Sequence, residues 1–216
     1  MNVFIHGWSF SKQIWKDFFK LENSLFLDLP FHGNQNLIFE KKIIDSYIDY
    51  IEPQIKDRTN IIGWSLGASI AVKFALTYPK KVRKLILIGF SPKFKDKELG
   101  HDPKIIKAFM LSLKKDFNRT VYDFRKLSSD EEFREIPLPE KNGAINILKE
   151  FIDLDLTDHL KKINHQVIII HGRQDKVINP KASIFTHNEI KKSKLILTDA
   201  NHSPFLYNPD IIVNHL

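Results

Sequence analysis

Residues 61–68 read IIGWSLGA, in which Ser65 stands between two glycines after an apolar run. The stretch at 60–64 is typical of a buried strand, and the residues after Ser65 are small enough for a tightly packed helix. This strand, tight turn and helix match G-x-S-x-G, a pattern that exposes the serine hydroxyl at the end of a strand. The pattern alone does not distinguish a nucleophile from a turn serine, so the role of Ser65 depends on which other residues the chain places near it.

Apolar runs alternate with helical patterns along most of the chain. Six such runs are NVFIH (2–6), LFLDL (25–29), NIIGW (60–64), KLILIGF (84–90), QVIIIHG (166–172) and KLILT (194–198). Helical patterns cover 39–55, 66–78 and about 180–190. Near-continuous apolar strands separated by helices predict an α/β fold with a mostly parallel sheet of about six strands and helices on both faces.

The alternation breaks once, between residues 91 and 163. Apolar residues recur at helical spacing over 102–127 and again over 147–152, so we expect a helical cap inserted before the fifth strand. Residues 1–90 and 164–216 then form the core, and 91–163 the cap. Residues 93–126 carry ten Lys/Arg against five Asp/Glu. This basic stretch is either an ordinary solvated helix face or a surface that docks an acidic partner.

Composition excludes several classes of function. The 216 residues contain no cysteine, and no apolar run approaches the roughly 18 residues that span a bilayer. The first residues lack the pattern of a signal peptide, so we expect a cytoplasmic protein without membrane contact, and a monomer. The net charge of +7 is spread along the chain without a nucleic-acid-binding motif. Metal-ligand spacing and phosphate-binding loops are likewise missing, so we expect neither a metal nor another cofactor.

A serine nucleophile needs a base and an acid that orients the base. Asp175 follows the fifth apolar run and His202 follows the sixth, which places both at the ends of parallel strands, on the edge where Ser65 lies. We therefore predict that Ser65, Asp175 and His202 are catalytic. Asp199 is too close to His202 in the chain to orient its ring, and His171 is expected to be structural.

An oxyanion formed at Ser65 needs two N–H donors. The N–H of Leu66, next to the nucleophile, is one candidate, and the N–H of Trp8 in the loop after the first strand is the other. The indoles of Trp8 and Trp64 are expected either to line an acyl pocket or to pack in the core.

Five segments together resemble the α/β-hydrolase superfamily over nearly the whole length: HGW (6–8), DLPFHGNQ (28–35), GWSLGA (63–68), HGRQDKVI (171–178) and NHSPF (201–205). The first predicted strand begins at residue 2, so we expect a sheet without the two leading strands usual in that superfamily. Within it, the pair HGW and GWSLG resembles the pimeloyl-[acyl-carrier protein] methyl ester esterases of biotin synthesis. The resemblance implies hydrolysis of a methyl ester on a pimeloyl chain carried by acyl carrier protein, with release of methanol.

The resemblance also implies site residues beyond the three catalytic ones. Trp8 and Leu66 would contact the substrate beside the nucleophile. The cap residues that would line the acyl channel are Phe124, Arg125, Lys126, Leu127 and Ser128. The basic residues that would meet the acidic carrier are Arg119, Arg125 and Lys126. A general carboxylesterase, a thioesterase, a carbon–carbon bond hydrolase and a non-catalytic ligand-binding protein remain alternatives.

Overall fold

A parallel sheet forms the centre of the molecule. The computed structural model describes residues 1–34, 37, 39 and 42–216. Its strands are β1 (Asn2–Ile5), β2 (Ser24–Leu27), β3 (Thr59–Trp64), β4 (Val82–Ile88), β5 (Gln166–Gly172) and β6 (Ser193–Thr198). They lie in the order β2-β1-β3-β4-β5-β6, and every neighbouring pair is parallel. The expected sheet of about six strands is therefore confirmed.

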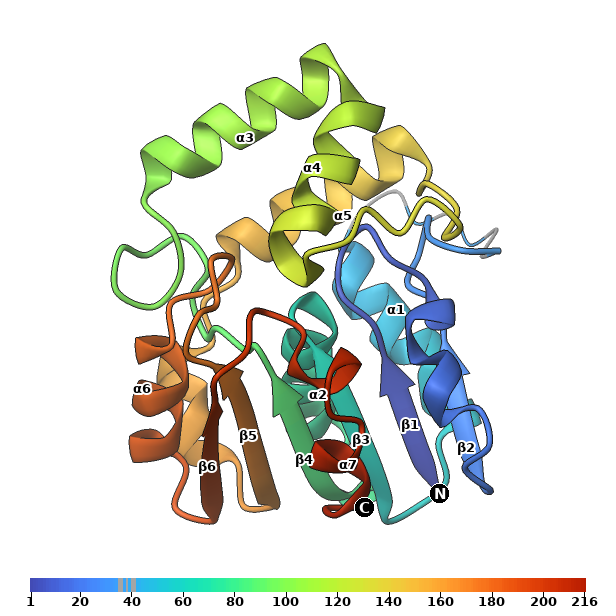
Figure 1. Cartoon of the computed structure of the whole chain (residues 1–216). Helices are drawn as coiled ribbons and strands as arrows, with labels where there is room; N and C mark the ends of the chain where they lie inside the picture. Colours follow the sequence, from blue (N-terminus) through green and yellow to red (C-terminus); the bar gives the residue numbers. More distant parts are fainter. Residues whose placement is uncertain (35–36, 38, 40–41) are drawn as a thin grey trace.

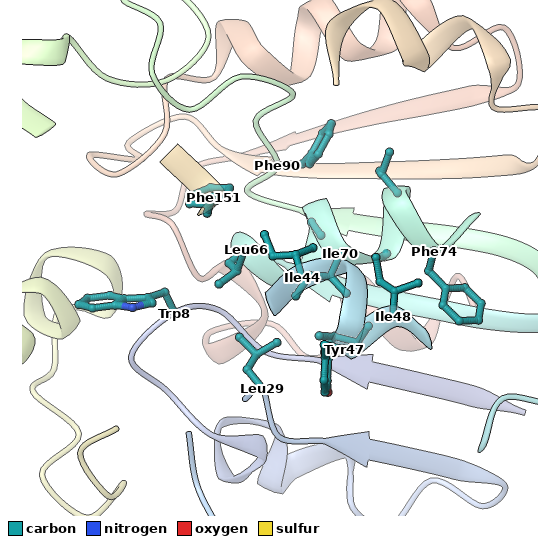
Figure 2. Packing of buried hydrophobic residues seen from close by; sticks show 14 of the residues in the cluster. Trp8, Leu29, Ile44, Tyr47, Ile48, Leu66, Ile70, Phe74, Phe90 and Phe151 are labelled. Carbon is teal, nitrogen blue, oxygen red and sulfur yellow. The ribbon is translucent and has the colours of Figure 1, made fainter. Parts of the chain in front are cut away.

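Alternate residues of each strand enter different cores, as the period of two requires. On one face Val3, Ile61 and Leu85 pack with the apolar residues of α1 (Ile43–Ile51) and α2 (Leu66–Thr77). Figure 2 shows this core, with Trp8 at one end of the view and Phe74 at the other. On the opposite face Phe4, Ile62 and Ile86 pack against η1 (Lys12–Phe18), η5 (Pro204–Leu206) and α7 (Asp210–Val213).

Two predicted helices have different bounds in the structure. The helix expected over 39–55 begins at Ile43, since residues 39 and 42 are not helical and 40–41 lie outside the described residues. It passes into η2 (Glu52–Gln54), where Pro53 lacks the N–H that a regular helix would use. The helix expected over 180–190 is α6 (Lys181–Glu189), and η3 (Pro79–Lys81) leads into β4.

The segment between β4 and β5 is helical, as expected. It contains α3 (Pro103–Lys115), α4 (Phe117–Ser129), α5 (Lys141–Asp153) and η4 (Thr157–Lys162). The periodic stretch 102–127 divides at Asp116, whose backbone is extended and whose carboxylate accepts the N–H of Arg119 at 3.1 Å as the N-cap of α4. Figure 1 shows α3, α4 and α5 over the edge at which the strands end. Within the described residues, none of the helices is long and apolar enough to cross a membrane.

Candidate active site

Ser65 occupies a strained turn between β3 and α2. Its φ of 54° and ψ of −119° lie in a region that residues with a side chain rarely adopt. The turn is tight because neither flanking glycine has room for a Cβ. A Cβ on Gly63 would lie 2.6 Å from Ala68 Cα, and one on Gly67 would collide with Ile5 O. The close approach predicted from the sequence is thus confirmed, and it holds the Ser65 hydroxyl at the N-terminus of α2.

Asp175 and His202 meet at the same edge of the sheet. The Asp175 carboxylate accepts a hydrogen bond from His202 Nδ1 at 2.7 Å, and both side chains are buried. The His202 carbonyl accepts the indole N–H of Trp64 at 2.9 Å, and the centroids of the two rings lie 5.5 Å apart. His202 therefore packs against the residue that precedes Ser65. His202 Nε2 is buried without a hydrogen-bond partner in the part of the chain that the structure describes. A buried polar atom without a partner calls for an explanation, and a group that exchanges a proton with a ligand is one.

Four donors converge on the Asp175 carboxylate. Oδ1 accepts the N–H groups of Val177 and Ile178 at 2.7 and 2.8 Å, while Oδ2 accepts His202 and lies 3.0 Å from His171 Nε2. Burial by itself would raise the pKa of Asp175, but the charge of His202 and the hydrogen bonds from both histidines hold it well below its usual range. Asp175 therefore remains an anion aimed at His202.

The loop after β1 lies against Ser65. A Cβ built on Gly7 would be 3.3 Å from Ser65 Cβ, so the residue before Trp8 packs against the serine turn. The Trp8 indole donates to Ala144 O in α5 at 2.8 Å and packs edge-on against the rings of Phe109 and Phe124. Trp8 thus contacts the cap through its side chain and lines the same cavity as Ser65.

Two neutral histidines support this loop. His6 Nδ1 donates to Gly7 O at 2.7 Å, and His32 Nε2 accepts the N–H of Ser9 at 3.1 Å. Burial is the main cause that lowers the pKa of each histidine to about 3, so both are uncharged at neutral pH. The neutral tautomers fit their partners, because each ring donates from Nδ1 to a carbonyl and accepts a backbone N–H at Nε2.

A cavity of about 410 Å³ extends from Ser65 into the cap. Its walls include Trp8, Phe109, Phe124, Leu148 and Phe151, so they are mainly apolar. Its outer wall consists of exposed positions of two cap helices, namely Ile105 and Ser112 of α3 with Asp123 and Leu127 of α4. An apolar channel that begins at a serine and ends between two surface helices suits a chain-like apolar ligand.

The structure corrects several predicted cap residues. Of the segment 124–128, only Phe124 and Leu127 line the cavity. Ser128 is buried and donates to backbone carbonyls of α4, and Lys126 is exposed outside the cavity lining. Arg125 is fully buried, so its predicted contacts with the acyl chain and with a carrier protein are wrong.

Three further sequence predictions concern Arg119, Trp64 and Asp199. Arg119 is exposed as a docking residue requires, but Asp123 pairs with it at 3.0 Å. Trp64 does not line the cavity, because its side chain points into the core on the opposite face of the sheet. Asp199 is exposed and pairs with Arg173, which agrees with its rejection as the orienting acid.

Comparison with known proteins identifies the family and the fold. The family model described as serine aminopeptidase, S33, matches residues 44–205. The chain belongs to this α/β-hydrolase family. The sequence is 28% identical to the pimeloyl-[acyl-carrier protein] methyl ester esterases of Wigglesworthia glossinidia brevipalpis and Shewanella woodyi, over 96% of this chain and 88% and 89% of theirs. An esterase from Exiguobacterium antarcticum has the same fold, with a TM-score of 0.86 and 22% identity over 99% of this chain and 88% of that one.

Three site residues of this hydrolase were not predicted from its sequence. His171 was expected to be structural, yet it contacts the Asp175 carboxylate. His32 precedes Gly33 in FHG (31–33), just as His6 precedes Gly7. This repeated histidine–glycine pair is the sequence feature that could have indicated a role for His32. His101 lines the cavity together with Ser65, and burial lowers its pKa. It comes from the irregular segment before α3, which carries no periodic signal that would assign it to the site.

Proposed function

We propose that this hydrolase is a serine carboxyl-ester hydrolase with Ser65 as nucleophile, His202 as base and Asp175 as orienting acid. The observation that carries the proposal is the hydrogen bond between Asp175 and His202 Nδ1 at the sheet edge where the strained Ser65 turn lies, together with a His202 Nε2 that has no hydrogen-bond partner among the described residues. Asp175 holds the tautomer in which His202 Nδ1 is protonated, so Nε2 is free to accept the Ser65 proton.

The reaction follows from these positions. Ser65 Oγ attacks the ester carbonyl carbon while its proton passes to His202 Nε2, and the N–H groups of Trp8 and Leu66 stabilise the oxyanion. The bond between the carbonyl carbon and the alcohol oxygen then breaks, and the His202 proton passes to that oxygen, releasing the alcohol. Water attacks the acyl-serine with His202 again as base, which yields the carboxylate and restores Ser65.

The proposed substrate is the methyl ester of pimeloyl-[acyl-carrier protein], after which the similar esterases of Wigglesworthia glossinidia brevipalpis and Shewanella woodyi are named. The apolar cavity from Ser65 to the surface between α3 and α4 suits an acyl chain that remains tethered outside. An acidic carrier at that surface would meet exposed lysines. Within the described chain, these lysines form no ion pair: Lys104, Lys107, Lys114, Lys115 and Lys126.

Two measurements test this proposal in sequence. The first compares unaltered protein with Ser65→Ala for hydrolysis of p-nitrophenyl butyrate and for labelling by a fluorophosphonate probe. We expect a loss of roughly 10³-fold or more in kcat and loss of labelling, as for removal of a serine nucleophile. Equal rates would contradict the assignment, and an unlabelled native protein would favour a non-catalytic ligand-binding role.

The second measurement compares the methyl ester of pimeloyl-[acyl-carrier protein] with p-nitrophenyl butyrate and with acyl-carrier thioesters. We expect the highest kcat/KM for the carrier-linked methyl ester. A higher value for thioesters, or for short free esters, would replace this substrate with that of a thioesterase or a general carboxylesterase.

A further inference from the structure

Arg125 is a fully buried cation whose partners are backbone carbonyls. It projects from α4 and donates to Ser9 O through Nε at 3.1 Å and also through Nη2. Its other bonds reach Phe133 O and Ile136 O, each at 2.8 Å, and Pro137 O at 2.9 Å. No carboxylate pairs with it among the residues that the structure describes. Burial lowers the pKa of Arg125 to about 10, so it remains charged at neutral pH.

Arg125 thereby joins α4 to the segment that follows it and to a loop that is distant in sequence. Ser9 O belongs to the loop after β1, whereas the other three carbonyls belong to the segment between α4 and α5. The guanidinium also lies 5.4 Å from the ring centroid of Phe10, the next residue of the loop. The cap therefore holds the loop at the residue that follows Trp8.

The remaining groups of this loop are held from the core. His6 fixes Gly7 O, and His32 fixes the N–H of Ser9, so Arg125 on Ser9 O completes a run of three consecutive peptide units with defined orientation. Ser9 itself has a φ of 72°, a conformation that a non-glycine residue leaves when its restraints are removed. The Ser9 hydroxyl is buried without a partner in the described chain, so the restraints on Ser9 act through its backbone.

We propose that Arg125 is a positioning residue, which sets the Trp8 N–H for the oxyanion by holding the Ser9 carbonyl from the cap. This inference rests on the proposed function, because it assigns Trp8 N–H to the oxyanion hole. An arginine suits the task, since its planar fork of five donors reaches several carbonyls at once, whereas a lysine ammonium is a point donor. A buried charge without a counter-ion is otherwise costly, which argues against retaining it for stability alone.

The test uses Arg125→Met, which keeps side-chain length but removes all donors, and Arg125→Lys, which keeps the charge. Arg134→Gln is the matched control, since Arg134 is exposed and lies over the same Tyr122 ring that Arg125 faces. Each variant is assayed with p-nitrophenyl butyrate and with a short trifluoromethyl ketone, whose serine adduct places an oxyanion in the hole. Hydrogen exchange of the peptide spanning residues 7–10 is measured in parallel.

We expect kcat of Arg125→Met to fall on the order of 10- to 100-fold with KM within about twofold, because the loss falls on the transition state. Affinity for the ketone should fall by the same factor, exchange over 7–10 should quicken, and Arg125→Lys should recover part of each. Arg134→Gln should match the unaltered protein.

Two results would overturn the inference. One is a folded Arg125→Met protein with kcat and ketone affinity within twofold of the unaltered protein. The other is a rise in KM for the substrate by the same factor as the loss of ketone affinity, because that result indicates general damage to the pocket. If Arg125→Met does not fold, Arg125→Lys decides by the same criteria. Lack of any Ser65-dependent hydrolysis in the unaltered protein would refute the proposed function instead, and exchange over 7–10 would still show whether Arg125 holds the loop.

Discussion

The edge of the sheet and the cap build this site in different ways. At the sheet edge each functional group has several dedicated partners: Asp175 accepts from two N–H groups and two histidines, and Ser65 is locked into its turn by backbone contacts. In the cap, α3 and α4 each contribute several side chains to the cavity wall, and the shape of the cavity does not depend on any one of them. The proposed chemistry thus depends on a few residues that each have several fixed contacts. The proposed selection of ligand length and docking depends on many residues with few specific contacts each.

Arg119 and Arg125 show the same difference within one helix. Both lie on α4, but Arg119 is exposed and paired with Asp123, while Arg125 is buried and serves the sheet edge through Ser9. The cap therefore has an exposed outer face, which we propose as a docking surface, and an inner face that contacts the loop after β1.

The largest effect is expected at the sheet edge from Asp175→Asn. An amide can present its oxygen or its NH2 group to His202 Nδ1, but it cannot stabilise the protonated ring, so kcat should fall roughly 10³- to 10⁴-fold with little change in KM. Steady-state kinetics with p-nitrophenyl butyrate measures this. Circular dichroism and thermal unfolding serve as the control for fold. A fall of less than tenfold in a folded variant would remove Asp175 from the proposed mechanism.

Acid should lower the free energy of unfolding, because His6 and His32 at the sheet edge are neutral in the folded protein. Because the pKa values of His6 and His32 are lowered to about 3, the unfolded chain binds protons that the folded chain does not. Stability is therefore complete above the unfolded pKa near 6.5 and declines as pH falls toward 3. Each histidine should cost about 1.4 kcal/mol per pH unit between about pH 6 and pH 4.

Urea unfolding at several pH values measures this loss. Carboxylates also contribute to the slope, so the comparison is made with His32→Gln, which retains a hydrogen-bond acceptor but does not titrate. The slope of unfolding free energy against pH should decrease by about one proton in that variant. An unchanged slope would mean that His32 is charged in the folded protein.

Charge reversal on the cap tests the other side of the comparison. Replacing Lys104, Lys107 and Lys126 with glutamate should lower kcat/KM for a carrier-linked ester roughly tenfold at low salt, because steering of an acidic partner is electrostatic. Hydrolysis of p-nitrophenyl butyrate should be unaffected. The matched control reverses Lys191, Lys192 and Lys194, exposed residues at the start of β6. Equal losses on both substrates would argue against docking at the cap.

The smallest effect is expected from His171→Gln. His171 Nε2 faces Asp175 Oδ2 and Ile178 O, both acceptors, so it carries a proton and donates to the carboxylate that orients His202. Loss of the ring should lower kcat roughly fivefold and move the acidic limb of the pH profile of kcat/KM, since the hydrogen bonding of Asp175 changes. Ser183→Ala, which removes only the bond at His171 Nδ1, is the control. A uniform fall in rate at every pH would indicate a purely structural role.

Sequence reasoning worked best where the signal is local. The strands are near-continuous apolar runs, and the serine turn is defined by two glycines within five residues, so both were predicted with small errors at their ends. It failed for α4. Arg125 lies four residues after Val121 and eight after Phe117, hence on the buried stripe, but its charge suggested the surface. Four backbone carbonyls satisfy that charge, three from the irregular segment after α4 and one, Ser9 O, from a distant loop, and helical periodicity gives no sign of these contacts.

The sequence by itself determined which residues follow the ends of β3, β5 and β6, and therefore which side chains share one edge of a parallel sheet. Strand period, turn glycines and chain order are properties of neighbouring residues, so they are readable without a fold. Only the tertiary structure decided that His171 contacts Asp175, that α3 and α4 enclose a channel, and that Arg125 faces inward to Ser9. The physical reason is that burial turns an unsatisfied polar group into a large cost, and the partners that offset it come from distant segments.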